Sequence, residues 1–303
     1  MSPKPFTLAM VVPCYNEEEV LATTKEELST LLQHLKSKNL IDEASFICFI
    51  DDGSRDRTWE LIEEFAKEPH IKGLKLSRNC GHQNALLAGL FYAEGVCDAA
   101  VSMDADLQDD INVVEQMCQK FQDGYEIVYG VRKRRDTDTP FKRITAEGFY
   151  KVMRFMGVDI IENHADFRLM SKRALQWLKE FEEVNLFLRG IIPLLGLKSD
   201  IVYYDRKERL AGESKYPLKK MLAFAWDGIT SFSVAPLRFI TLLGIIVLGV
   251  SLILSIWAII AKLSGSAVSG WTSMMLILLF LGGVQMLSIG TVSYTHLTLP
   301  TKA

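Results

Sequence analysis

Short apolar runs alternate with longer amphipathic segments through the first 130 residues. The apolar runs predict buried strands at residues 8–12, 46–50, 71–76, 99–103 and 127–129. The segments between them have helical spacing at residues 20–36, 58–66, 83–93 and 111–121. Short apolar strands that alternate with helices predict an α/β domain with a Rossmann-like, mainly parallel sheet. In such a sheet, ligands bind beyond the carboxyl ends of the strands.

The last quarter of the chain follows a different pattern. Residues 239–261 and 271–292 are two uncharged, largely apolar runs, and the linker between them is rich in Ser and Gly. Each run reaches the ~20 residues that cross a hydrocarbon core of ~30 Å, so we expect a transmembrane helical hairpin within residues 236–292. A hairpin buried in a soluble core is the alternative, which the absence of a polar stripe disfavours.

Basic residues give this hairpin an orientation. The linker contains only Lys262, whereas four cations precede the first run: Lys215, Lys219, Lys220 and Arg238. This asymmetry predicts that the N-terminal domain lies in the cytoplasm. The apolar residues of the preceding stretch also have helical spacing, at Leu218, Met221, Leu222, Ala225, Trp226 and Ile229. Residues 214–235 therefore predict a juxtamembrane helix in the membrane interface, the alternative being a helix packed on the globular domain.

Composition narrows the functional class. The 303 residues carry a net charge of −3, with 49% hydrophobic and 23% charged residues, yet only Lys262 and Lys302 are charged after Arg238. This distribution excludes a disordered chain, a basic nucleic-acid-binding protein and a wholly soluble domain. Five scattered cysteines without a Cys-x-x-Cys pair predict buried free thiols in a reducing compartment. We expect no signal peptide, because the first apolar run is too short.

Polar clusters follow each of the first four predicted strands, at residues 13–19, 51–56, 77–84 and 104–110. Asp104 and Asp106 stand one residue apart at a strand end, where two carboxylates can hold Mg²⁺ or Mn²⁺ and leave positions for phosphate oxygens. The chain has no Gly-x-x-x-x-Gly-Lys loop and no Gly-x-Gly-x-x-Gly after the first strand, which disfavours an ATPase and a nicotinamide-binding domain. His82 and His164 are isolated histidines, for which the sequence favours structural roles.

The order of these clusters resembles the motif series of family 2 glycosyltransferases with the GT-A fold, and more narrowly the polyprenyl-phosphate glycosyltransferases, namely bactoprenol glucosyltransferases and dolichol-phosphate mannose synthases. The motifs are VPCYNEE at 12–18, DDGSRDRT at 51–58, SRNCG at 77–81, DADLQD at 104–109, DFRLM at 166–170, NLFLRG at 185–190 and RKERLAGESKY at 206–216. The resemblance covers about residues 6–290 and implies a cytoplasmic GT-A domain over residues 1–213.

The resemblance also implies roles for individual residues. The nucleotide-sugar would be held by Pro13, Tyr15, Glu17, Asp51, Asp52, Asn79 and Asp104. Asp104 and Asp106 would hold the metal, and the catalytic group would consist of Asp166, Asp109 and Gln108, with Asp166 ranked first as a candidate base. The acceptor phosphate or the donor diphosphate would meet Arg206, Arg209, Ser214 and Lys215. A solvated charged loop is the alternative for residues 206–209, and the basic run at 132–135 fits a substrate-binding loop and a solvated loop equally.

These roles together predict a membrane-anchored inverting glycosyltransferase that transfers glucose from UDP-glucose to undecaprenyl phosphate. The enzyme would be a multi-pass protein of the bacterial inner membrane and would contact membrane lipids. Self-association is left open. The alternatives are GDP-mannose or a UDP-amino sugar as donor, and a non-catalytic scaffold. A processive synthase is disfavoured because the chain lacks a Gln-x-x-Arg-Trp motif.

The final residues, 293–303, depart from the resemblance, which implies a charged cytoplasmic tail. The stretch SYTHL at 293–297 can be encoded by a transposon-end sequencing adapter. We therefore expect this tail to be an assembly artefact, and reading the genomic locus across this point tests that expectation.

Overall fold

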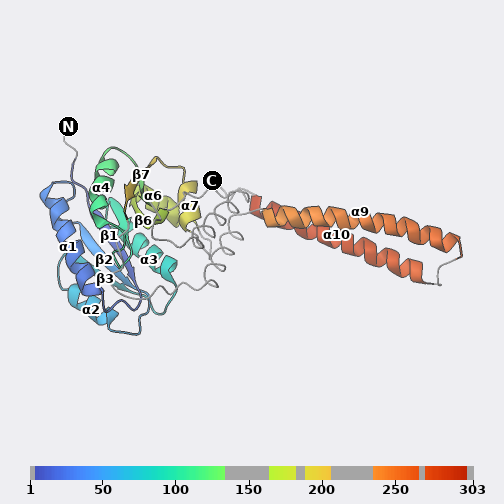
Figure 1. Ribbon diagram of the computed structural model, residues 1–303, viewed down its shortest axis with the longest axis horizontal. Coiled ribbons are helices and arrows are strands. Elements are labelled where there is room, and N and C mark those ends of the chain that lie inside the picture. Colours follow the sequence, from blue (N-terminus) through green and yellow to red (C-terminus); the bar gives the residue numbers. More distant parts are fainter. Residues whose placement is uncertain (1–3, 134–163, 182–187, 206–234, 266–269, 299–303) are drawn as a thin grey trace. The chain divides into compact units, whose positions relative to one another are not determined.

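The computed structural model describes residues 4–133, 164–181, 188–205, 235–265 and 270–298 (Figure 1). The described residues up to 205 belong to one compact unit and those from 235 onward belong to a second. The predicted juxtamembrane helix lies outside the described residues, as do the acceptor-site residues Arg206, Arg209, Ser214 and Lys215. Those predictions stay predictions.

A seven-stranded sheet forms the centre of the first unit, with strand order β3-β2-β1-β4-β6-β5-β7. Its strands are β1 (Leu8–Cys14), β2 (Phe46–Asp51), β3 (Ile71–Lys75), β4 (Ala99–Ser102), β5 (Ile127–Arg132), β6 (His164–Ser171) and β7 (Ser199–Tyr204). The helices are α1 (Leu21–Ser37), α2 (Thr58–Phe65), α3 (His82–Glu94), η1 (Ile111–Val113), α4 (Val114–Gln122), α6 (Lys172–Lys179) and α7 (Leu188–Leu194). All the strands and helices predicted for the first 130 residues are confirmed, with small shifts at their ends.

The sheet is mainly parallel, as predicted, but β6 is an exception. It lies antiparallel to both of its neighbours, β4 and β5, whereas the other pairings are parallel. Neither β6 nor β7 was predicted as a strand. The β6 sequence HADFRLMS contains two charged residues that are largely buried, Asp166 and Arg168, so it lacks the uninterrupted apolar run by which buried strands are identified.

Helices cover both faces of the sheet (Figure 1). The core against α1 and α2 includes Met10, Val12 and Phe49, which share one face by the strand alternation. Their neighbours Val11 and Ile50 point to the opposite face, where α3 packs so closely that a Cβ on Gly89 would lie 2.5 Å from either side chain. This close approach places the N-terminus of α3 beside the carboxyl ends of the central strands.

The antiparallel insertion of β6 determines which side chains meet at that edge. In the register of β4 and β6, Ser102 pairs with Arg168. Asp166 therefore lies beyond the end of β4, next to the segment that carries Asp104. Two segments about sixty residues apart in the sequence thus contribute carboxylates to one place.

The second unit consists of α9 (Ala235–Leu263) and α10 (Trp271–Thr298), which pack along each other (Figure 1). The buried residues described in α9 recur every seven residues, at Gly244, Ser251 and Ala258. On α10, Gly283 meets Leu248 so closely that an added Cβ would lie 2.9 Å from that side chain. Small residues therefore let the two helices approach each other, and their outer faces expose large apolar side chains.

Among the described residues, one helical stretch is long and apolar enough to cross a membrane, over Thr241–Leu263. The apolar stretch described in α10 is shorter, over Trp271–Gln285. The predicted hairpin of two helices is present, but the crossing of a membrane by both of them is not confirmed.

Candidate active site

Three loops at the carboxyl ends of β1, β2 and β3 are joined by hydrogen bonds between backbone and side chains. The backbone N–H of Asn16 donates to Ser54 Oγ (3.0 Å), and the N–H of Arg55 donates back to Asn16 Oδ1 (2.8 Å). The N–H of Glu17 donates to Thr58 Oγ1 (2.9 Å). These reciprocal bonds fix the first loop against the second and leave the ring of Tyr15 41% exposed at their edge.

Asp51 and Asp52 are both buried at the end of β2, and the side chains of both accept hydrogen bonds from backbone N–H groups. Asp51 Oδ1 accepts from the N–H of Ser54, which supports the turn. Asp52 accepts from the N–H groups of Cys80 (2.7 Å) and Gly81 (3.0 Å), so it fastens the loop between β3 and α3. Within the described structure, Asp51 Oδ2 is buried without a hydrogen-bond partner. Pro13 is buried in β1, whereas Asn79 is exposed on the third loop.

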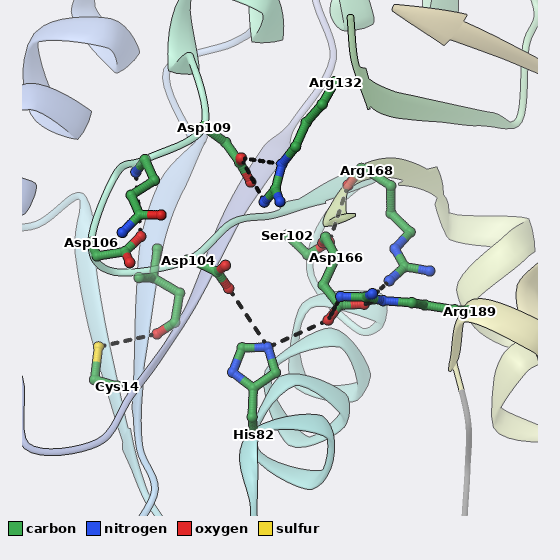
Figure 2. Close-up of polar contacts among 12 residues, drawn as sticks. Cys14, His82, Ser102, Asp104, Asp106, Asp109, Arg132, Asp166, Arg168 and Arg189 are labelled. Carbon is green, nitrogen blue, oxygen red and sulfur yellow. Dashed lines mark hydrogen bonds and ion pairs between the residues drawn. The ribbon is translucent and has the colours of Figure 1, made fainter. Parts of the chain in front are cut away.

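Asp104 and Asp106 follow β4, as Figure 2 shows. The buried hydroxyl of Thr24 on α1 donates to the carbonyl of Ala105 (2.6 Å), which anchors the loop between the two carboxylates. Leu107 adopts φ +46°, a left-handed conformation that is strained for a branched side chain and is typical of functional loops. Partial desolvation, offset in part by His82 and reinforced by the neighbouring carboxylates, raises the pKa of Asp104 above its ordinary value, although its side chain is 42% exposed.

The donor set fits a hard divalent cation. Carboxylates that repel one another gain from a shared Mg²⁺ or Mn²⁺, and oxygen is the ligand that both ions prefer. No group of three His, Cys, Asp or Glu side chains in the described ranges is arranged to hold a metal ion. Asp104 and Asp106 would thus supply part of a coordination shell, and the oxygens of a diphosphate and water would supply the rest.

Asp166 is held by two arginines (Figure 2). Arg168 Nη2 donates to Oδ1, while Arg189 donates from Nε to Oδ1 (3.3 Å) and from Nη2 to Oδ2 (3.2 Å). Burial opposes the charge on Asp166, but Arg189 and Arg168 outweigh it and hold the pKa of this carboxyl well below its usual range. A carboxylate of such low basicity is a poor proton acceptor, which argues against the candidate base.

Asp109 forms a second charged cluster, on the other side of the β4 loop. Its Oδ1 accepts from Arg132 Nη2 (3.1 Å), and Arg132 Nε also donates to the hydroxyl of Tyr204 (3.3 Å). The other oxygen, Oδ2, is buried without a hydrogen-bond partner in the described structure. Gln108, next to it, is buried as well. Arg132, the first residue of the basic run, is therefore part of the site and not a solvated residue.

His82 is the first residue of α3, and its side chain lies between the carboxylates of Asp104 and Asp166 (Figure 2). Its Nε2 is 3.6 Å from Asp104 Oδ1 and 3.7 Å from Asp166 Oδ2. The side chain is 45% exposed and faces these two carboxylates.

The structure brings the predicted residues of the first four strand ends and Asp166 to one edge of the sheet. His82, Arg168 and Arg189 were not predicted as site residues, and for Arg132 the sequence left a substrate-binding loop and a solvated loop open. The signal for Arg189 was present in the motif NLFLRG, but its partner depends on where β6 is inserted. Four of the five cysteines are buried, as expected, and Cys80 is exposed.

Comparisons with known proteins agree along most of the chain. Residues 9–178 match the model of the family described as "Glycosyl transferase family 2". The "Uncharacterized glycosyltransferase YkoT" of Bacillus subtilis is 54% identical over 94% of this chain and 85% of its own length. The "Prophage bactoprenol glucosyl transferase homolog" of Escherichia coli is 41% identical over 93% of this chain and 91% of its own length.

Among solved structures, mannosyl-3-phosphoglycerate synthase from Rubrobacter xylanophilus aligns with 74% of this chain and 72% of its own. The TM-score is 0.49 and the sequence identity is 13%.

Proposed function

We propose a specific reaction for this chain, which belongs to glycosyl transferase family 2 and is a glycosyltransferase. It transfers glucose from UDP-glucose to undecaprenyl phosphate, a polyprenyl phosphate. The transfer inverts the configuration at the anomeric carbon of the sugar. The choice of acceptor rests on the 41% identity to a bactoprenol glucosyl transferase homologue over 93% of the chain. The aligned region extends beyond the domain matched by the family model and into the apolar segment. The product would be a lipid-phosphate-linked sugar for the cell envelope.

The layout of the site supports this chemistry. The nucleoside would lie against the interlocked loops of β1 and β2, near Tyr15 and Glu17, with Asp51, Asp52, Pro13 and Asn79 forming and positioning that subsite. Asp104 and Asp106 would hold Mg²⁺ or Mn²⁺, which neutralises charge on the departing diphosphate. Asp109 and Gln108 would face the sugar.

The acceptor explains why Asp166 need not remove a proton. A phosphate monoester has a second pKa near ~6, so a lipid phosphate is already largely dianionic at neutral pH. Asp166, ion-paired with Arg168 and Arg189, instead presents a fixed negative charge beside the sugar. In that position it would stabilise positive charge that develops at the anomeric carbon.

The second unit would anchor the enzyme in the membrane by both helices. The outer faces of α9 and α10 expose apolar side chains that water would not favour, among them Leu252, Ile253, Ile277 and Phe280. Trp257 and Trp271 pack edge to face near the connection between the helices, next to Lys262, as is common at a membrane interface. We extend the proposal to a bacterial inner-membrane protein with its sheet domain in the cytoplasm.

Lipid labelling tests the proposed function. Membranes that contain the full chain are incubated with undecaprenyl phosphate and one radiolabelled donor at a time: UDP-glucose, GDP-mannose or a UDP-amino sugar. We expect label from UDP-glucose in the organic phase, and its loss on addition of EDTA. Transfer from another donor would correct the sugar, and no transfer from any of them would contradict the function and favour a non-catalytic scaffold.

A further inference from the structure

His82 occupies a position that the proposed roles do not use. Its Nε2 is within ion-pair distance of Asp104 on the β4 side and of Asp166 on β6, so it marks the space between the candidate metal site and the fixed negative charge. Both of these N···O distances are longer than a hydrogen bond, so Nε2 is not hydrogen-bonded to either carboxylate. The side chain is 45% exposed, so solvent reaches the ring.

The backbone holds His82 in place. Gly81, the N-cap of α3, has φ +91° and ψ 152°, a conformation that side-chain-bearing residues rarely adopt. The N–H of Gly81 donates to Asp52, which is itself buried at the end of β2. The imidazole therefore projects from a helix start that is tied to the nucleotide side of the site.

We infer that His82 is a specificity-determining residue that hydrogen-bonds a hydroxyl of the transferred sugar. The inference rests on the proposed function and adds a residue to it. With the diphosphate at Asp104 and Asp106, the sugar must extend from there toward Asp166, because transfer occurs at that end. The path runs past Nε2 of His82.

Hydrogen-bonding capacity distinguishes a sugar hydroxyl from a phosphate oxygen as the partner. Phosphate oxygens only accept hydrogen bonds, so they could accept from the imidazole N–H but could not donate to the carboxylates of Asp104 and Asp166 beside it. A hydroxyl can accept from an imidazole N–H and donate to a carboxylate at once. An imidazole flanked by two carboxylates offers that combination.

Equilibrium binding to the full-length protein in detergent tests the inference, with UDP-glucose and UDP as the two probes at saturating Mn²⁺. We expect His82→Leu to weaken the binding of UDP-glucose about tenfold, the effect of one lost hydrogen bond to a sugar, and to change the binding of UDP less than about twofold. His82→Gln keeps a side-chain N–H and should restore part of the loss. In turnover, KM for the donor should rise while KM for the lipid acceptor stays unchanged.

His34 supplies the matched control. It is 48% exposed and pairs with Glu115 at 3.0 Å, away from the sheet edge, so His34→Leu should leave both affinities unchanged. Equal loss of UDP and UDP-glucose affinity in His82→Leu would overturn the inference, because it would indicate a diphosphate contact or a general structural effect. Unchanged UDP-glucose affinity would overturn it as well. The proposed function fails by a different result, a wild-type protein that transfers no sugar.

Discussion

At the scale of single residues, the site is a set of charges that are fixed before substrate arrives. Arg168 is 1% exposed, and its Nη1 is buried without a hydrogen-bond partner in the described structure. The carboxylate of Asp166 is therefore the main group that balances the positive charge of Arg168. Such a group costs stability unless its partner stays ionised. The arrangement is therefore sensitive to any change that removes charge from Asp166.

Asp166→Asn should destabilise the protein by about 3–5 kcal/mol at neutral pH, because it leaves two guanidinium groups without their counter-charge. The pKa of Asp166 is lowered from 3.8 in the folded state, so its contribution is complete above that pH and is lost as pH falls further. The difference between wild type and variant should thus shrink below about pH 4. Urea unfolding followed by tryptophan fluorescence at several pH values measures it.

Asp200→Asn is the control for this experiment. Asp200 also has a lowered pKa, through its hydrogen bond from Lys120, but the two side chains are 31% and 32% exposed. Its loss should cost less than about 1 kcal/mol. Comparable costs for the two variants would argue against a special role for the buried arginines.

Asp106→Asn should weaken the binding of Mn²⁺ in the presence of UDP by at least about tenfold, because a neutral amide replaces a charged ligand. Titration followed by the electron paramagnetic resonance of free Mn²⁺ measures this binding. Asp110→Asn is the control, since Asp110 caps η1 from the same loop and an asparagine can keep that bond. Unchanged Mn²⁺ affinity in Asp106→Asn would contradict the metal assignment.

Sequence reasoning reached the carboxylates of this site but not the cations around them. Asp104, Asp106 and Asp109 follow a strand that its apolar residues reveal, so their position could be predicted. Arg132, His82 and Arg189 gain their roles through partners on other elements. Arg189, for example, has a role only because β6 places Asp166 beside it, and no local pattern reports that pairing.

At the scale of elements, α3 links the packing of the sheet to the site. Its first residue is His82, and the absence of a side chain at Gly89 lets it lie against β1 and β2. The apolar periodicity predicted this helix to within one residue at each end. The periodicity did not predict the closeness of the packing, which depends on the size of a single residue.

Gly89→Ala should destabilise the protein by about 1–3 kcal/mol, although alanine favours helices, because the new methyl group would overlap Val11 and Ile50. Gly95→Ala, at the end of the same helix, meets only Tyr92 O at 3.8 Å and should be neutral or slightly stabilising. Thermal unfolding of both variants compares them. A Gly89→Ala protein as stable as wild type would show that α3 can shift at no cost.

At the scale of the whole molecule, the chain divides its chemistry between two units of opposite character. The sheet unit holds the buried charges described above. In the unit formed by α9 and α10, the described residues bury small side chains and expose large ones, the reverse of a soluble helical pair. Composition alone predicted this division, whereas the membrane crossing of α9 and of α10 stays a prediction.

Labelling with a membrane-impermeant maleimide tests the two-span topology. In a Cys80→Ser background, Ser264→Cys should react in intact cells, because it lies at the connection between the helices. In the wild-type chain, the exposed thiol of Cys80 should react only after permeabilisation. An epitope added after Ala303 should be shielded in intact cells, and its detection there would show that α10 does not cross.

The place of β6 in the sheet has a consequence for how the protein is made. β6 lies between β4 and β5, yet the ribosome synthesises it after both of them. A nascent chain that folds from its N-terminus must therefore keep a gap in the sheet, with strand edges unpaired on either side, until residues 164–171 arrive. The same strand delivers Asp166, so the part of the candidate site at β1, β2 and β4 can form early, whereas the cluster around Asp166 forms late. Among the described residues, Arg189 of α7 then pairs with Asp166, and α7 precedes the apolar helices in the order of synthesis.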